Sequence, residues 1–276
     1  MKISCLSVSL FSAIINGELS IKEYASLCKS LDLDGFDLGI IQLKNHTPVY
    51  LNQLKRDLRN IGISPAMITT YPNFTHPDAL QREREFEYLR HDIALASDVG
   101  AKFLRITAGQ AHPEMPIDEG IKHVVDFFHQ IAPVADKFGV KLVYENHSKP
   151  GAWDFMDFSN PPEIFLSIVE KIADTNIGVN FDTANILVSG NENTIEVLEK
   201  VIDKVETIHV AETATLGKME PVLLGTGLAP IKDVFTTLKK YGWDKWLCIE
   251  EWGNLGVEGV VEAVKYTRKI WEETSI

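Results

Sequence analysis

The sequence predicts an α/β fold, specifically a (β/α)8 TIM barrel with a closed, parallel, eight-stranded sheet. Three observations predict it. Strand-like apolar runs alternate with segments of helical period along the whole chain. Glycine stands at the helix-to-strand joints at positions 62, 100, 139 and 242, where a left-handed residue ends a helix. The length of 276 residues, 45% of them hydrophobic, suits one barrel domain spanning 1–276.

The elements follow in order. Each expected strand is a short apolar run, and these runs cover 2–8, 35–40, 63–69, 102–107, 140–146, 176–182, 205–211 and 246–251. Between them, apolar residues recur at helical spacing, most clearly over 21–31, 80–100, 121–139 and 194–203. An open, doubly wound sheet is the alternative arrangement of the same elements.

Charge and composition exclude several classes of partner. The formal net charge is −12 and the sequence pI is near 5.1, which opposes nucleic acid or an anionic membrane as the main partner. A neutral small molecule fits better. No uninterrupted apolar run reaches the roughly 18 residues that a spanning helix needs. We expect no nucleic-acid or membrane partner, and a homodimer as the alternative to a monomer.

The cysteines and the first residues indicate a cytoplasmic protein. Cys5, Cys28 and Cys248 are too few and too scattered for a disulfide framework, so we expect free thiols. The opening MKISCLSVSLFSAII resembles a signal peptide only superficially, because it carries one lysine and serines interrupt its apolar run.

Four strand segments in the second half of the chain carry metal-capable side chains. They are VYEN, VNFD, TIHV and CIEE, which contain Glu145, Asp182, His209 and Glu250. Alternate residues of a strand share a face, and within each segment the apolar residues occupy the other face. A lone histidine is more often a core residue, and Asp182 alone could be a helix cap. Four inward polar groups on four successive strands are costly to bury without an ion, so the set predicts a divalent-metal site.

Three carboxylates and one imidazole favour one divalent ion, with Mn²⁺ first and Mg²⁺, Co²⁺, Fe²⁺ or Zn²⁺ as alternatives. A sugar could chelate at the open positions through neighbouring carbonyl and hydroxyl oxygens. Glu145 and Glu250 would then be the acid–base pair of a sugar, keto-sugar or polyol isomerase or epimerase working through a metal-bound enediolate. A lyase or dehydratase acting on a keto-inositol or keto-sugar is the first alternative. A non-catalytic sugar-binding barrel is the second.

Neighbouring positions supply further candidates. His147 shares the inward face with Glu145, so we expect it to bind substrate. Arg105 also points inward, and we expect either an ion pair with Asp37 or a substrate contact. Glu251 has the opposite parity and is expected outside the ligand set.

The irregular segment 147–163 is long for a compact domain and carries Trp153, Phe155 and Phe158. We expect a lid or a sugar-stacking wall, or else a loop tucked onto the barrel rim. Tyr71, Phe74 and Trp252 are candidate stacking faces.

These segments resemble the xylose isomerase-like barrel superfamily, in its sugar phosphate isomerase/epimerase branch. YENH, FDTAN, IHVAE and LGTGLAPIKDVFTTLKKYGWDKWLCIEEW carry the resemblance over about residues 140–252. It implies metal ligation by Glu145, Asp182, His209 and Glu250, with the two glutamates as acid–base pair.

The chain departs from this branch at several positions. Asn185 replaces a common histidine, Ala211 and Glu212 replace a Lys-Asp pair, and Lys218 is the only cation between the seventh-strand histidine and Gly225. We expect Asn185 and Glu212 to contact substrate together with His147 and Arg105. The additional histidines of the endonuclease IV branch are absent, which argues against DNA repair.

The segment Gly225-Thr226-Gly227 reads either as a phosphate cradle or as a tight turn. Because cations are few near the expected mouth, an unphosphorylated sugar or keto sugar is the predicted substrate.

Overall fold

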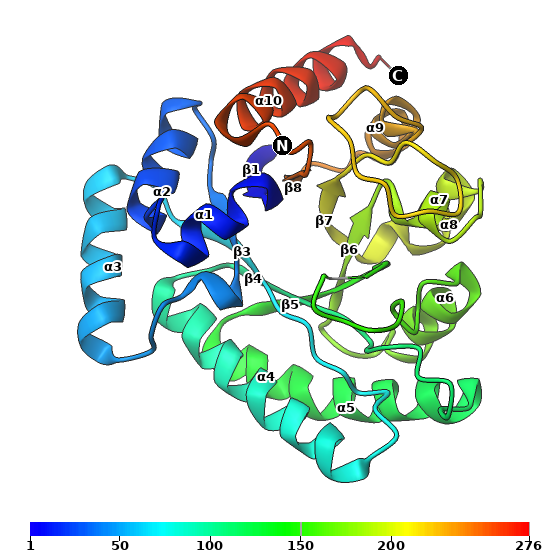
Figure 1. Cartoon of the computed structure of the whole chain (residues 1–276). Helices are drawn as coiled ribbons and strands as arrows, with labels where there is room; N and C mark the ends of the chain where they lie inside the picture. Colours follow the sequence, from blue (N-terminus) through cyan, green and yellow to red (C-terminus); the bar gives the residue numbers. More distant parts are fainter. Residues whose placement is uncertain (150, 276) are drawn as a thin grey trace.

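The computed structural model describes residues 1–149 and 151–275 and shows eight parallel strands surrounded by helices (Figure 1). The strands are β1 (Lys2–Ser7), β2 (Phe36–Gly39), β3 (Pro65–Thr69), β4 (Phe103–Ile106), β5 (Lys141–Glu145), β6 (Gly178–Asp182), β7 (Val205–Val210) and β8 (Trp246–Glu251). Their order in the sheet is β1-β8-β7-β6-β5-β4-β3-β2, so each strand lies beside its neighbour in sequence. This order confirms the barrel and excludes the doubly wound alternative.

The helices form the outer layer. They are α1 (Phe11–Asn16), α2 (Ile21–Ser30), α3 (Pro48–Ile61), α4 (Ala79–Val99), α5 (Ile117–Phe138), α6 (Pro162–Lys171), α7 (Asn185–Val188), α8 (Thr194–Val201), α9 (Ile231–Lys240) and α10 (Gly256–Glu273). The short helices α1 and α7 are additions to the expected alternation and follow directly after strand ends. Gly62, Gly100 and Gly139 end α3, α4 and α5 with a positive φ, which confirms the expected joints.

Two apolar clusters fill the molecule. The larger lies between the sheet and the helices. The smaller lies inside the barrel and consists of Ala66, Met67, Phe103, Val143, Trp246 and Cys248. Two residues further along β5 and β8, the same inward face carries Glu145 and Glu250 instead of Val143 and Cys248. The barrel interior therefore changes from apolar to polar toward the carboxyl ends of its strands.

The junction between β1 and β2 combines side-chain hydrogen bonds with two backbone ones, in which the amides of Asp34 and Gly35 donate to the Ile3 carbonyl at 2.9 and 3.3 Å. Seven strand pairs have ladders, and among the residues that the structure describes no ladder joins β1 to β2. The amide of Ile3 donates to Asp34 Oδ2 at 2.8 Å, and Ser4 Oγ donates to Asp37 Oδ2 at 2.7 Å. Asp37 Oδ1 accepts from the amide of Met67 at 2.9 Å, which ties β3 to the same carboxylate.

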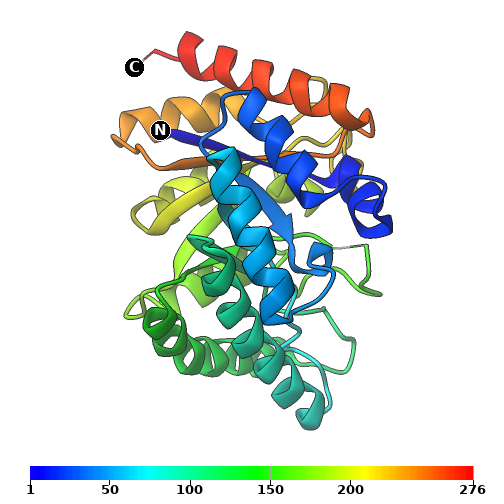
Figure 2. The same cartoon turned by 90° about the vertical axis from the view of Figure 1, so that its left-hand side faces the viewer.

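Seen from the side, both termini lie at one end of the barrel, and α1 lies at the other end (Figure 2). The three cysteines are free and buried, as expected. Nowhere in the described chain does a helix combine the length and apolar character that crossing a bilayer requires.

Candidate metal centre

The four predicted ligands converge. Glu145, Asp182, His209 and Glu250 each offer one ligand atom, and these atoms lie within 4.8 Å of one another. Glu145 ends β5, Asp182 ends β6, and His209 and Glu250 each precede the last residue of β7 and β8. Asp182 pairs with His209 across β6 and β7, whereas Glu145 pairs with Asn180 and His209 with Cys248, each two residues before the next ligand on the same inward face. The period-two reading of the strands is confirmed here.

Glu145 is held on both sides. Its Oε1 accepts from His209 Nδ1 at 2.6 Å and from Asn180 Nδ2 at 3.0 Å, while Oε2 lies 3.1 Å from Arg105 Nε. Asn180 is itself oriented, because Thr207 Oγ1 donates to its Oδ1 at 2.7 Å. Burial opposes ionisation of this carboxyl, but Arg105 and His209 hold the pKa of Glu145 at about 2. Glu145 is therefore a fixed anion.

Asp182 is anchored through one oxygen. Its Oδ1 accepts from the amides of Ala184 at 2.8 Å and Asn185 at 2.7 Å. Its backbone is clamped by Asn146, whose Oδ1 accepts from the Asp182 amide at 2.7 Å and whose Nδ2 donates to the Asp182 carbonyl at 3.0 Å. Burial, and then the charges of Glu250 and Glu145, raise the pKa of Asp182. Three carboxyl groups thus compete for negative charge in one small volume.

His209 and Glu250 complete the set. His209 Nδ1 lies 3.4 Å from Glu250 Oε2, and the Glu250 side chain is 21% exposed, against 1% for Glu145. Burial alone would lower the pKa of His209, but the carboxylates of Glu145 and Glu250 raise it. In turn, burial opposes ionisation of Glu250, and His209 lowers the pKa of this carboxyl. Glu250 is the ligand-set carboxylate with the greatest access to solvent.

The donor set fits one divalent cation. Within the part of the chain that the structure describes, Asp182 Oδ2, Glu145 Oε2 and His209 Nε2 are buried without a hydrogen-bond partner. Metal–ligand bonds near 2 Å place ligand atoms on opposite sides of an ion about 4 Å apart, in keeping with the spread of this set. A dication would also offset the mutual repulsion that raises the pKa of Asp182.

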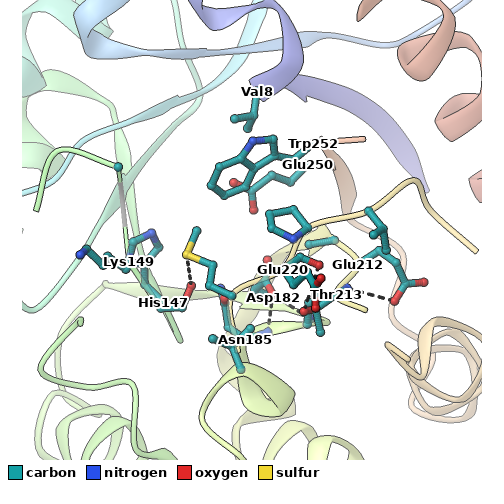
Figure 3. Close-up of a pocket in the computed structure, with 18 of the residues that line it drawn as sticks. Val8, His147, Lys149, Asp182, Asn185, Glu212, Thr213, Glu220, Glu250 and Trp252 are labelled. Atoms are coloured by element: carbon teal, nitrogen blue, oxygen red, sulfur yellow. Dashed lines mark hydrogen bonds between the residues drawn. The ribbon is translucent and has the colours of Figure 1, made fainter. Parts of the chain in front are cut away.

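A cavity of about 370 Å³ opens above this cluster. Asp182 and Glu250 reach it from the cluster, and Figure 3 shows Trp252 beside Glu250, with His147 and Lys149 on another wall. Residues from five parts of the chain contribute to its lining, within 8–12, 147–149 with Gly151, 182–188, 211–222 and 250–254, and Tyr71 lines it in addition. These segments follow strand ends, which is where barrel enzymes keep their active sites.

Three of the four predicted substrate residues line this cavity. His147, Asn185 and Glu212 are all in its wall. The Glu212 carboxylate also binds the backbone of the following loop. It accepts hydrogen bonds from the amide of Ala229 at 2.6 Å and from those of Thr213 and Gly225 at 3.2 Å. The Gly225–Gly227 segment is therefore a turn wrapped around a carboxylate of the chain itself. The other interpretation of this segment, a cradle free to bind a phosphate, is wrong.

Arg105 lies outside the cavity lining among the described residues and sits below Glu145 with 1% exposure. The expected ion pair with Asp37 is wrong, because Arg105 pairs with Glu145. Arg105 Nη1 also donates to the Thr70 carbonyl at 2.9 Å, and the guanidinium lies 4.4 Å from the Tyr71 ring centroid. Glu251 stays outside the ligand set, as expected, where it accepts from Ser7 Oγ and Ser9 Oγ.

Only some of the aromatic residues that the sequence suggested as stacking faces line the cavity. Tyr71 and Trp252 line the cavity, whereas Phe74 is fully buried and stacks on Phe127. In the 147–163 segment, Trp153 and Phe158 are buried, so this part is a loop tucked onto the rim. Its first residues, 147–149, and Gly151 do line the cavity. Pro150 falls outside the described residues.

Two orienting residues escaped the sequence analysis. Asn180 fixes Glu145, and Asn146 fixes the backbone of Asp182. Their signal was present, since Asn180 shares the inward face of β6 with Asp182, two residues before it.

Comparisons with known proteins agree with this architecture. Residues 25–270 match the family described as Xylose isomerase-like TIM barrel. A curated inosose dehydratase of Clostridium botulinum is 24% identical over 267 residues, covering 85% of each chain. Another, of Glaesserella parasuis, is 25% identical over 227 residues, covering 71% of each.

Solved structures of low sequence identity share the fold. The IolI protein with a bound zinc atom has a TM-score of 0.81 at 19% identity, covering 100% of this chain and 99% of that one. A D-tagatose 3-epimerase-like protein has a TM-score of 0.78 at 18% identity, covering 99% and 97%. The probable 3-DHS dehydratase AsbF of Bacillus anthracis has a TM-score of 0.73 at 14% identity, covering 100% of both chains. Because the family match spans most of the sequence, the chain belongs to the xylose isomerase-like TIM barrel family.

Proposed function

We propose that this protein is a divalent-metal-dependent enzyme that transfers a proton at the carbon beside the carbonyl of an unphosphorylated keto sugar or keto-cyclitol. The observation that carries the proposal is the convergence of Glu145, Asp182, His209 and Glu250 at the floor of a cavity of about 370 Å³. When bound, the dication supplies Lewis acidity to a substrate carbonyl oxygen. Mn²⁺ is the first candidate, and the bound zinc of the IolI structure makes Zn²⁺ the first comparison.

Glu250 is best placed to take the proton. It is the partly exposed carboxylate and it faces the cavity, whereas Glu145 is buried and paired with Arg105. A carboxyl group held at a pKa of about 2 is a poor proton acceptor but a firm ligand. Glu145 keeps the ligand role that we assigned to it. To return a proton from the other side in an epimerase or isomerase, Glu145 would first have to take one up, against the hold of Arg105 and His209 on its negative charge.

The wall of the cavity favours a neutral substrate. Four carboxylates face it, from Asp182, Glu212, Glu220 and Glu250. Among the described residues of the lining, Lys149 carries the single permanent positive charge. A phosphate or carboxylate on the substrate would meet repulsion here. Trp252 and Tyr71 supply aromatic faces for the apolar side of a sugar or cyclitol ring.

Two outcomes follow from the same first step. Returning the proton gives an epimer or an isomer, which is our leading proposal. In the other outcome the β-hydroxyl takes up the proton from Glu250 and leaves as water while a C=C bond forms, which makes the protein a dehydratase. The curated relatives in Clostridium botulinum and Glaesserella parasuis, both inosose dehydratases, support this outcome. The burial of Glu145 and its ion pair with Arg105 also support it, because dehydration can use Glu250 as its one base.

The test combines metal analysis with proton NMR in D₂O. We expect about one metal per chain and solvent exchange at one substrate carbon, followed by an epimer or by loss of water. Glu250→Gln should lower the rate of solvent exchange at the substrate carbon by at least ~10²-fold, as expected for loss of a positioned base. Glu220→Gln is the matched control, since Glu220 lines the same cavity outside the ligand set. Saturable sugar binding without any exchange would instead support the non-catalytic barrel, and full exchange in Glu250→Gln would refute the assigned base.

A further inference from the structure

A buried carboxylate lies behind His147. The loop after β5 folds back so that Asp157 forms an isolated antiparallel bridge with Gln110. The Asp157 amide donates to the Ser148 carbonyl at 2.5 Å, and the Phe158 amide donates to the Gly109 carbonyl at 2.7 Å. These backbone bonds from two loops fix Asp157, whose side chain has no exposed surface.

The two oxygens of Asp157 have different partners. Oδ1 accepts from the amide and the hydroxyl of Ser159, both at 2.7 Å. Oδ2 lies 3.5 Å from His147 Nδ1, at the outer limit of hydrogen-bond distance, and neither atom has a hydrogen-bond partner within the described residues. Burial raises the pKa of Asp157, and His147 opposes the rise. A buried carboxylate needs a compensating donor, and the His147 ring is the group that can supply one.

The His147 ring is held in place by aromatic neighbours. Its centroid lies 6.1 Å from that of Tyr71 and 6.0 Å from that of Trp153, with the Trp153 plane at 79°. The ring lines the cavity, on a wall away from Glu250 and Trp252 (Figure 3). Since the buried Nδ1 faces Asp157, Nε2 is the nitrogen left for the cavity.

We propose that Asp157 is a positioning residue that holds His147 in the Nδ1–H tautomer, so that Nε2 accepts a hydrogen bond from one substrate hydroxyl. In a neutral imidazole the two nitrogens have opposite roles, and the partner of one sets the role of the other. The consequence is specificity for polyols that carry a free hydroxyl opposite the Glu250 side of the ring. This inference rests on the proposed function for its substrate and on the geometry alone for the tautomer.

Ring ¹⁵N NMR of His147 in the wild-type protein tests the tautomer without any substrate. We expect the Nδ1–H form in the wild type and a mixture, or the Nε2–H form, in Asp157→Asn. Asp154→Asn is the matched control, because Asp154 lies exposed in the same loop. A wild-type ring in the Nε2–H form would overturn the proposal, whatever the activity of the protein.

Kinetics test the specificity. Asp157→Asn should lower kcat/KM about 10- to 100-fold, as is typical when the group that orients a histidine is lost. The His147→Gln/Asp157→Asn double variant should be no worse than His147→Gln, because Asp157 acts through His147. Additive losses would indicate a merely structural Asp157 and refute the positioning role. A wild type with no turnover but the expected tautomer would refute the proposed function and leave the His147–Asp157 contact established.

Discussion

Replacing Arg105 with methionine should destabilise the metal-free protein strongly. Arg105 and Glu145 form an ion pair of 3.1 Å with both side chains 1% exposed. Methionine keeps the length of the side chain but leaves the Glu145 carboxylate buried with fewer donors. The hydrogen bonds that the Glu145 carboxylate would keep come from His209 and Asn180.

The magnitude follows from the carboxyl group itself. The pKa of Glu145 falls from its usual 4.5 to about 2 in the folded protein. Each pKa unit corresponds to about 1.4 kcal/mol, so the net effect of burial and partners is roughly 3 kcal/mol in favour of the charged form. Burial opposes the charged form, and Arg105 is the largest of the favourable partners. Removing one partner of a buried pair costs about 3–5 kcal/mol in other proteins. We expect a loss of about 3 kcal/mol, which lowers Tm by roughly 6–12 °C for a chain of this size.

Thermal unfolding followed by circular dichroism in EDTA at pH 7 measures the effect. Arg90→Met is the matched control, because Arg90 pairs with Glu87 at 3.0 Å but the two side chains are 50% and 64% exposed. Such surface pairs contribute at most about 1 kcal/mol. The folded pKa of Glu145 lies below the unfolded one, so its stabilisation is present above about pH 4.5 and is lost as the pH falls toward 2. Equal Tm shifts in the two variants, or an Arg105→Met deficit that persists undiminished in acid, would refute this reasoning.

Three further outcomes are expected. Burial and then Glu85 raise the pKa of Asp92 to about 7, so the folded protein loses stability as the pH rises from about 4 to 7. Asp92→Asn should therefore be more stable than the wild type at pH 8, by about 1–2 kcal/mol, and equal to it at pH 4, as measured by urea midpoints. Gly227→Ala should cost about 1–3 kcal/mol, because its methyl group would meet the Thr213 carbonyl and lie 2.7 Å from Glu212 Oε1. Gly151→Ala meets nothing within 4 Å and should leave the calorimetric Tm unchanged. Finally, burial raises the pKa of all three cysteine thiols, those of Cys5, Cys28 and Cys248. A disulfide reagent at pH 8 should therefore label none of them in the native protein and all of them in urea.

Strand periodicity predicted the barrel and the convergence of the four candidate ligands, because both depend on a regular geometry. A strand fixes which side chains share a face, and the carboxyl ends of parallel strands meet at one end of a barrel. Glu145 and Glu250 could therefore be brought together across more than a hundred residues of sequence. The same parity separated Glu250 from Glu251, which the structure places outside the cluster.

The alternation of side chains along a strand does not predict which inward-facing residues of different strands form ion pairs. Asp37 and Glu145 both face inward, and the pairing of Arg105 with Glu145 depends on how the strands are staggered. Irregular loops are harder still. Asp157 reaches His147 only through backbone bonds between the loops after β4 and β5, and Glu212 is enclosed by a turn whose amides point inward. Neither arrangement has a period that a sequence would display.

Among the described residues no ladder joins β1 to β2, so the ring of strands has one weakly bonded gap, crossed by side-chain hydrogen bonds and by the amides of Asp34 and Gly35. The carboxylates of Asp34 and Asp37 cross the gap by accepting hydrogen bonds from Ile3 and Ser4 of β1. Asp37 also accepts from the Met67 amide of β3. Strands β5 and β6, with Glu145 and Asp182, lie diametrically opposite the gap. Amide protons beside Asp34 and Asp37 should exchange with solvent sooner than those of β5 and β6, since opening the gap breaks the two backbone hydrogen bonds from Asp34 and Gly35 but no ladder. The gap therefore lies opposite Glu145 and Asp182 but next to β8, the strand that carries Glu250.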